Sequence, residues 1–241
     1  MELHVAFRPE EAGDCHQRVV AVIDVIRATT SILVMAERGC DEILVGSSVE
    51  AVRRYRAVDP GVLLAGEQDG RAPEGFDFGN SPAAFAATNL AGERVAFATT
   101  NGTRALHLVR GGPVALIACL RNRAVVAEAL MAGARALGLD ATVVCAGREG
   151  RFGLDDAYTA GAIVEVMCAG SGNDVIELTD AAIAARALFR AYPDAEALLR
   201  VTRAGRQVMQ IGLTPDLSVC AELDRSALAP RVGERVRLLE P

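Results

Sequence analysis

Residues 19–38, VVAVIDVIRATTSILVMAER, decide how the rest of the chain is interpreted. The first part, residues 19–26, is an almost continuous run of β-branched and apolar side chains and predicts a buried strand. The second part, residues 29–38, has the apolar spacing of a helix. Asp24 and Arg27 lie near the point where one pattern gives way to the other. The stretch therefore predicts a strand that leads into a helix through a polar junction.

The same order of strand and helix recurs along the chain. Further strands are predicted at residues 42–45, 62–65, 94–98, 114–119 and 142–145, and helices between them at residues 49–57, 82–87, 103–109 and 123–137. From residue 155 onward the pattern is more helical, with helices predicted at residues 155–169, 180–191 and 194–211 before a short tail around 235–239. This alternation predicts an α/β fold, with mainly parallel strands covered by helices on both faces.

The division of the chain into domains is only faintly marked. The pattern breaks near residues 118–122 and again near 138–140, without a linker rich in Pro, Ser or Gly. We expect one unit over residues 1–241, built from two lobes of approximately 1–120 and 121–241.

Composition excludes several classes of protein. The chain has 241 residues, 51% of them hydrophobic, which is enough to bury a core. Only 4% are aromatic and the net charge is −6, which argues against a nucleic-acid partner. No apolar stretch reaches the roughly 18–20 residues needed to cross a bilayer, and residues 1–7 do not resemble a signal peptide. The six cysteines show no CxxC spacing. We expect a cytoplasmic protein without a membrane partner, a zinc site or a disulfide framework.

Residues at the carboxyl ends of the predicted strands are candidates for a binding site, because ligands of open parallel sheets bind there. They are mostly polar or small: Asp24, Arg27, Thr29 and Thr30 after the first strand, Glu67 after the third, Thr99, Thr100, Asn101, Gly102 and Thr103 after the fourth, and Cys145, Gly147 and Arg148 after the last. Hydroxyls, amides and arginine bind phosphate oxygens, whereas carboxylates bind metals. The mixture predicts a site for a phosphate and a divalent cation.

Each feature also has a purely structural explanation. In ATTNGTRAL, residues 98–106, Asn-Gly is a common turn pair and Thr a common helix cap. Asp24 can cap the helix that follows it, and Asp155 and Asp156 suit the positive end of a helix dipole. Only the coincidence of several polar junctions favours a functional site.

Several blocks carry a resemblance to a known family. They are residues 22–30 (VIDVIRATT), 66–67 (GE), 75–82 (GFDFGNSP), 99–103 (TTNGT), 145–147 (CAG), 154–156 (LDD) with 160–161 (AG), and 212–220, in which Asp216 and Cys220 match. With these blocks in this order, the chain resembles the 2-phosphosulfolactate phosphatases, magnesium-dependent enzymes of the coenzyme M pathway. The segment 201–206 departs from the family's version of that region.

The resemblance implies two related three-layer α/β/α lobes with mainly parallel sheets, an active site between them, and hydrolysis of a small acidic phosphate monoester. The expected reaction converts 2-phosphosulfolactate to sulfolactate and phosphate. We expect Mg²⁺ to be held by some of Asp24, Glu67, Asp155 and Asp156, and the phosphate charge to be neutralised by Arg27 and by amides and hydroxyls of residues 99–103. Thr29, Thr30, Asn80, Ser81, Cys145 and Gly147 would complete the pocket, with Arg148 near a second acidic group.

Other interpretations stay open. Cys145 and Arg151 have the spacing of a cysteine-dependent phosphatase, in which a thiolate attacks phosphorus. Asp24 at a strand end also suggests an aspartyl-phosphate, but Ile26 stands where such enzymes carry a second Asp. The chain could also be a non-catalytic binder of an acidic metabolite. A homodimer is expected as the default for a soluble enzyme.

Overall fold

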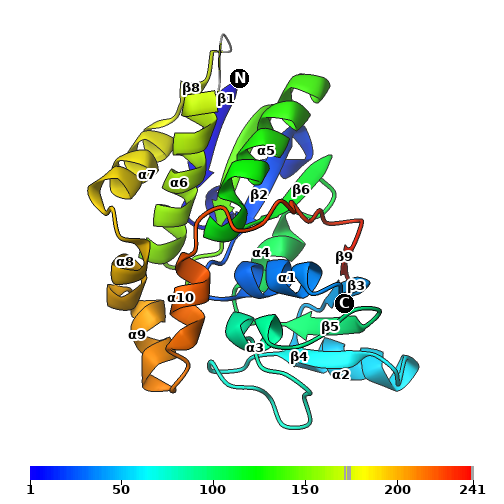
Figure 1. Cartoon of the computed structure of the whole chain (residues 1–241). Coiled ribbons are helices and arrows are strands. Elements are labelled where there is room, and N and C mark those ends of the chain that lie inside the picture. Colours follow the sequence, from blue (N-terminus) through cyan, green and yellow to red (C-terminus); the bar gives the residue numbers. More distant parts are fainter. Residues whose placement is uncertain (171, 173–174, 240–241) are drawn as a thin grey trace.

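Two parallel sheets organise the chain in the computed structural model, which describes residues 1–170, 172 and 175–239 (Figure 1). Sheet A has the strand order β6-β2-β7-β1-β8 and sheet B the order β4-β5-β3-β9. The strands of sheet A are β1 (Glu2–Ala6), β2 (Arg18–Ile23), β6 (Val114–Ala118), β7 (Asp140–Cys145) and β8 (Glu177–Leu178). Those of sheet B are β3 (Glu42–Val45), β4 (Leu63–Gly66), β5 (Arg94–Ala98) and β9 (Val236–Leu238).

Helices connect the strands and cover the sheets. They are α1 (Ala28–Glu37), α2 (Val49–Val58), α3 (Pro82–Ala86), α4 (Gly102–Leu108), α5 (Arg123–Leu137), α6 (Leu154–Gly170), α7 (Asp180–Ala191), α8 (Ala195–Val201), α9 (Arg203–Gln210) and α10 (Pro215–Ala221). Short 3₁₀ turns occur at Pro9–Glu11, Cys15–Gln17 and Leu120–Asn122. Every strand pair of the two sheets is parallel. The predicted α/β class with mainly parallel sheets and three α/β/α layers is confirmed.

The apolar run that forms β2 explains why both faces of sheet A are covered. Successive side chains of a strand point to opposite faces. Val19, Ala21 and Ile23 pack into a core beneath α5 and α6, whereas Val20 and Val22 pack into a second core that includes residues of α1, α4 and sheet B. β2 is thus buried on both faces, as an interior parallel strand requires.

Helix α1 lies between the two sheets, which explains its composition. Nine of its ten residues, all but the last, are buried, and they include Ile32 and Met35. A helix that is covered on all sides needs apolar or small side chains around its whole circumference. The outer face of sheet B is covered by α2, where Val52 packs against Leu44 and Leu64.

One predicted helix is divided in the structure. Residues 194–211 form α8 and α9 instead of one helix, with the break at Thr202. The Thr202 hydroxyl donates to the Leu199 carbonyl (2.8 Å) and accepts from the Gly205 amide (3.0 Å), so it ends one helix and caps the next. A Cβ at Gly205 would lie 1.9 Å from the Leu199 oxygen, so only glycine permits this close turn.

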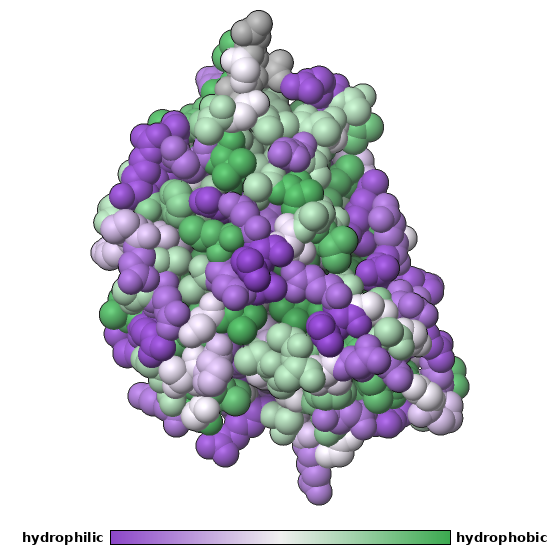
Figure 2. Space-filling view, viewed as in Figure 1, coloured by the Kyte–Doolittle hydropathy of each residue, from purple (hydrophilic) through white to green (hydrophobic). Residues whose placement is uncertain are grey.

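The lobes of approximately 1–120 and 121–241 stay a prediction, and sheet A takes strands from both halves. The segment between α10 and β9 crosses the face shown in Figure 1, and hydrophilic side chains run across the middle of the same face in Figure 2. Among the described residues, no helix combines the length and apolar character needed to span a membrane.

Candidate active site

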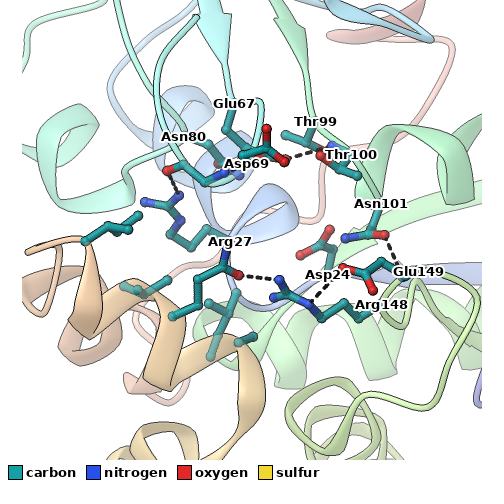
Figure 3. Close-up of a pocket in the computed structure, with 16 residues that line it drawn as sticks. Asp24, Arg27, Glu67, Asp69, Asn80, Thr99, Thr100, Asn101, Arg148 and Glu149 are labelled. Carbon is teal, nitrogen blue, oxygen red and sulfur yellow. Dashed lines mark hydrogen bonds and ion pairs between the residues drawn. The ribbon is translucent and has the colours of Figure 1, made fainter.

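The carboxyl ends of strands from both sheets meet around one cavity of about 100 Å³. Figure 3 shows Glu67, Thr99 and Thr100 on one side of it and Asp24 and Arg148 on the other. Of the predicted site residues, the following line it: Asp24, Arg27, Glu67, Asn80, Thr99, Thr100, Asn101 and Arg148. Gly147, Asp155 and Asp156 line an adjoining hollow that also includes Asp24, Asn101 and Arg148.

Asp24 follows directly on the last residue of β2 and is 8% exposed. Its backbone is fixed by Thr29, whose hydroxyl accepts from the Asp24 amide (3.0 Å) and donates to the Asp24 carbonyl (2.9 Å). The Thr30 hydroxyl donates in the same way to the Val25 carbonyl (2.9 Å). In the described structure these two threonines do not line the cavity. They hold the turn that presents Asp24.

Burial raises the pKa of Asp24 to about 7, with a further contribution from the nearby carboxylate of Asp155. Burial also raises the pKa of Asp155 to about 6. Two desolvated carboxylates that repel each other favour protonation unless a positive charge compensates them. Their burial therefore favours a cation close to these groups.

Gly102 lies directly against Asp24, at the start of α4. A Cβ at this position would lie 2.7 Å from Asp24 Oδ2 and 2.5 Å from the Ala28 side chain. Glycine therefore allows α4 to approach the β2–α1 turn. Thr103 is buried, and its hydroxyl donates to the Thr99 carbonyl (2.6 Å). Both residues shape the bend of residues 99–103 without lining the cavity in the described structure.

Asp156 joins the ends of β2 and β7. One of its carboxylate oxygens accepts from the Val25 amide (2.9 Å) and the other from the Gly147 amide (3.0 Å). Burial raises its pKa well above the usual value, and Asp155 and Asp24 add to the rise. Glu67 similarly joins two loops of sheet B, since its oxygens accept from the amides of Gly70 (2.7 Å) and Thr100 (2.8 Å).

Arg27 is held by Asp216 of α10, a residue to which the sequence assigned no role. Arg27 Nη1 lies 2.8 Å from Asp216 Oδ2, and the two side chains are only 4% and 1% exposed. Arg27 Nη2 donates to the Gly70 carbonyl (2.9 Å). The Ser81 hydroxyl and the Ala83 amide both donate to the other oxygen of Asp216. Ser81 thus supports the arginine indirectly. The block 212–220, which contains Asp216, was the sequence signal for the role of Asp216.

Other polar groups complete the wall of the cavity. Asn80 is 5% exposed, and its side-chain oxygen has no hydrogen-bond partner in the described structure. Arg148 donates to the side chain of Gln207 on α9, and the Asn101 side chain accepts from the Glu149 amide (3.1 Å). The sequence did not predict Asp69, Gln207 or the other residues of α9 that line the cavity, because neither a strand end nor a motif marks them.

Cys145 lies at the end of β7 but is fully buried. Burial raises the pKa of its thiol well above the usual value, and Asp156 and Asp155 raise it further. A nucleophilic thiolate requires the opposite shift. Arg151 is exposed in the turn after β7. Neither residue has the surroundings that a cysteine-dependent phosphatase needs.

The predicted metal ligands do not form a ready cluster. Among residues 1–170, 172 and 175–239 there is no group of three or more His, Cys, Asp and Glu side chains placed to hold a metal ion. Both oxygens of Glu67 and of Asp156 already accept backbone amides. Mg²⁺ is often bound by only one or two carboxylates together with water and phosphate oxygens. Asp24 and Asp155 fit that mode of binding.

Comparison with known proteins identifies the family. The family model described as 2-phosphosulpholactate phosphatase matches residues 6–235. The chain belongs to this phosphatase family. A Thermus thermophilus protein named "Probable 2-phosphosulfolactate phosphatase" is 40% identical over 90% of each chain. Proteins of the same name from Deinococcus radiodurans and Gloeobacter violaceus are 38% and 37% identical, over 95% and 92% of this chain and 92% and 90% of their own.

Proposed function

We propose that this member of the 2-phosphosulpholactate phosphatase family hydrolyses 2-phosphosulfolactate to sulfolactate and phosphate in a Mg²⁺-dependent reaction. The observation that carries the proposal is the meeting of two buried carboxylates, Asp24 and Asp155, with two arginines, Arg27 and Arg148, at adjoining cavities. Carboxylates suit a cation and guanidinium groups suit phosphate oxygens. The family match and the names of the relatives support the same reaction.

Asp24 and Asp155 would hold the Mg²⁺. Bound there, the ion would act as a Lewis acid on a phosphoryl oxygen and lower the pKa of a bound water. Burial, and after it the repulsion from Asp155, raises the pKa of Asp24 to about 7, and the positive charge of the ion would offset both effects. Asp156 would not need to bind the ion, because its role is to fix the loops that carry Asp24 and Asp155.

The protein's own donors would hold the phosphoryl group. Arg27 has five N–H groups, and Asp216 and the Gly70 carbonyl engage two of its nitrogens, so N–H groups remain for a ligand. Its orientation is set before substrate binds, which is the condition for efficient stabilisation of transition-state charge. Thr99, Thr100 and Asn101 would add hydroxyl, amide and backbone donors from the facing loop.

Phosphate release from 2-phosphosulfolactate tests the proposal. We expect release with Mg²⁺, its loss on addition of a chelator, and its recovery when Mg²⁺ is restored. Iodoacetamide should have no effect, because Cys145 is buried as a protonated thiol. Release that survives exhaustive chelation would contradict the metal requirement. Phosphate binding without any turnover would instead favour the non-catalytic binder. The cytoplasmic location and the homodimer stay predictions.

A further inference from the structure

A second hollow adjoins the proposed catalytic cavity. Its volume is about 260 Å³, against about 100 Å³ for the first, and Asp24, Asn101 and Arg148 line both. A phosphoryl group held beside Asp24 therefore has space next to it for the rest of an ester. The small first cavity suits a phosphoryl group, and the larger hollow suits the alcohol part.

Arginine side chains gather around the second hollow. Arg203 and Arg206 come from α9 and Arg151 from the turn after β7, in addition to Arg148. The side chain of Arg203 is 62% exposed and lies 3.9 Å from Glu149, a long ion pair. Within the described part of the chain, neither Arg151 nor Arg206 forms an ion pair with a carboxylate. Three arginines thus lie at one hollow with almost no acidic partner.

The carboxylates of the same hollow are more deeply buried than its arginines. Asp155 and Asp156 are 7% and 3% exposed, whereas Arg151, Arg203 and Arg206 are exposed. The acidic groups are therefore shielded from solvent, whereas the arginines are open to it. Arg206 is also positioned, because its Nη1 donates to the Val201 carbonyl (2.8 Å) at the end of α8. The Thr202 turn between α8 and α9 brings this group to the hollow.

We propose that the second hollow binds the acidic end of the substrate, a carboxylate or sulfonate carried by the alcohol part of the ester, through Arg151, Arg203 and Arg206. Guanidinium groups pair with such planar or trigonal oxyanions through two N–H groups at once. The inference rests on the proposed function, since it places the phosphoryl group beside Asp24. It makes α9 the element that selects acidic esters over neutral ones.

The test compares two ligands that occupy different parts of the site. The double variant Arg203→Gln/Arg206→Gln and the single variant Arg151→Gln change exposed side chains, and circular dichroism checks their folding. Isothermal titration calorimetry in Mg²⁺ buffer then measures the Kd of sulfolactate and of inorganic phosphate. Arg54→Gln, an exposed arginine on α2, removes the same charge far from the hollow and is the matched control.

We expect the Kd of sulfolactate to rise roughly ten- to hundredfold in the double variant, the effect of a lost charged hydrogen bond, and by less in Arg151→Gln. The Kd of phosphate should stay within about twofold, and Arg54→Gln should match the wild type. An unchanged sulfolactate Kd, or an equal loss for both ligands, would overturn the inference. Calorimetry needs no turnover, so its result stands even if the wild type releases no phosphate and the proposed reaction fails.

Discussion

At the scale of single residues, the site buries carboxylates that destabilise the folded protein when no ligand is bound. Asp24 and Asp155 are both buried, and Asp155 is close enough to raise the pKa of Asp24. A carboxyl whose pKa rises on folding destabilises the native state at every pH at which the unfolded chain is ionised. Such a cost is expected where a ligand supplies the missing charge.

We predict that Asp24→Asn abolishes turnover and stabilises the metal-free protein. The pKa of Asp24 rises from 3.8 to about 7 on folding, so the native state binds more protons than the unfolded state in this range. Wild-type stability should therefore fall as pH rises from about 4 to 7 in chelator, whereas the variant lacks this contribution. At pH 8 the variant should be more stable by on the order of 4 kcal/mol. Urea denaturation at pH 5 and pH 8 measures this difference.

The exposed residue Asp41 provides the control, since Asp41→Asn removes a carboxylate outside the site. An Asp24→Asn variant that is less stable than the wild type at pH 8 would contradict the unfavourable burial of the Asp24 carboxylate. Retained turnover would remove Asp24 from the site.

A second residue-scale prediction concerns the buried ion pair of Arg27 and Asp216. Asp216→Ala leaves a buried guanidinium without its counter-charge and should cost about 3–5 kcal/mol. Ser81→Ala removes one donor to the same carboxylate and should cost about 1–2 kcal/mol. Both should lower kcat, because Arg27 loses its fixed orientation. Denaturation and steady-state kinetics measure the two effects. A cost below about 1 kcal/mol for Asp216→Ala would show that the pair is not needed for folding.

At the scale of elements, the contact of α6 with α7 supports the helix whose first turn carries Asp155 and Asp156. Gly161 lies where the helices approach most closely, and a Cβ there would lie 1.9 Å from the Ala185 oxygen. Further along, the Glu165 carboxylate accepts from Arg186 Nε (2.7 Å) and from Arg190 Nε (2.8 Å). The contact between α6 and α7 therefore depends on the absence of a side chain at Gly161 and on the ion pairs of Glu165 with Arg186 and Arg190.

Gly161→Ala should destabilise the protein by about 1–3 kcal/mol or more, because the helices must separate to admit the methyl group. Gly170→Ala on the same helix is the matched control. Its Cβ would meet only Met131 Cε at 3.5 Å, and alanine favours the helix. Thermal unfolding should show a lower Tm for the first variant and an unchanged or higher one for the second. Equal Tm values would refute the close crossing.

Glu165→Gln should lower stability in a pH-dependent way. Hydrogen bonds from Arg190 and then Arg186 lower the pKa of Glu165 from 4.5 to about 2. A depressed pKa stabilises the fold above pH 4.5, and this contribution is lost as pH falls toward 2. The side chain is 27% exposed, so we expect about 1 kcal/mol at pH 7. Denaturation curves of variant and wild type should converge near pH 2. A difference that persists there would contradict the ion pair.

At the scale of the whole molecule, the two sheets share one helical layer, and their carboxyl ends therefore open onto one site. Much of this was predictable. Strands β3 and β5 and helix α5 have the predicted limits, because apolar spacing specifies them locally. The polar ends of β2, β4, β5 and β7 do line the adjoining cavities, because parallel strands bring their ends to one edge.

Contacts between distant segments were not predictable in this way. Asp216 reaches Arg27 across 189 positions of sequence, and no local pattern indicates that pairing. The division between α8 and α9 depends on how Thr202 and Gly205 pack in three dimensions. Thr29 and Thr30 stay predicted pocket residues, but their residue type alone does not show that their hydroxyls bond to the backbone of the turn after β2.

The most direct measurement is a crystal structure of the protein with Mn²⁺ in place of Mg²⁺ and with inorganic phosphate, using the anomalous signal to locate the metal. We predict one metal between the carboxylates of Asp24 and Asp155, with phosphate on the metal and on Arg27. A metal and phosphate bound elsewhere, with Asp24 and Asp155 free of both, would contradict the assignment of this cavity as the active site.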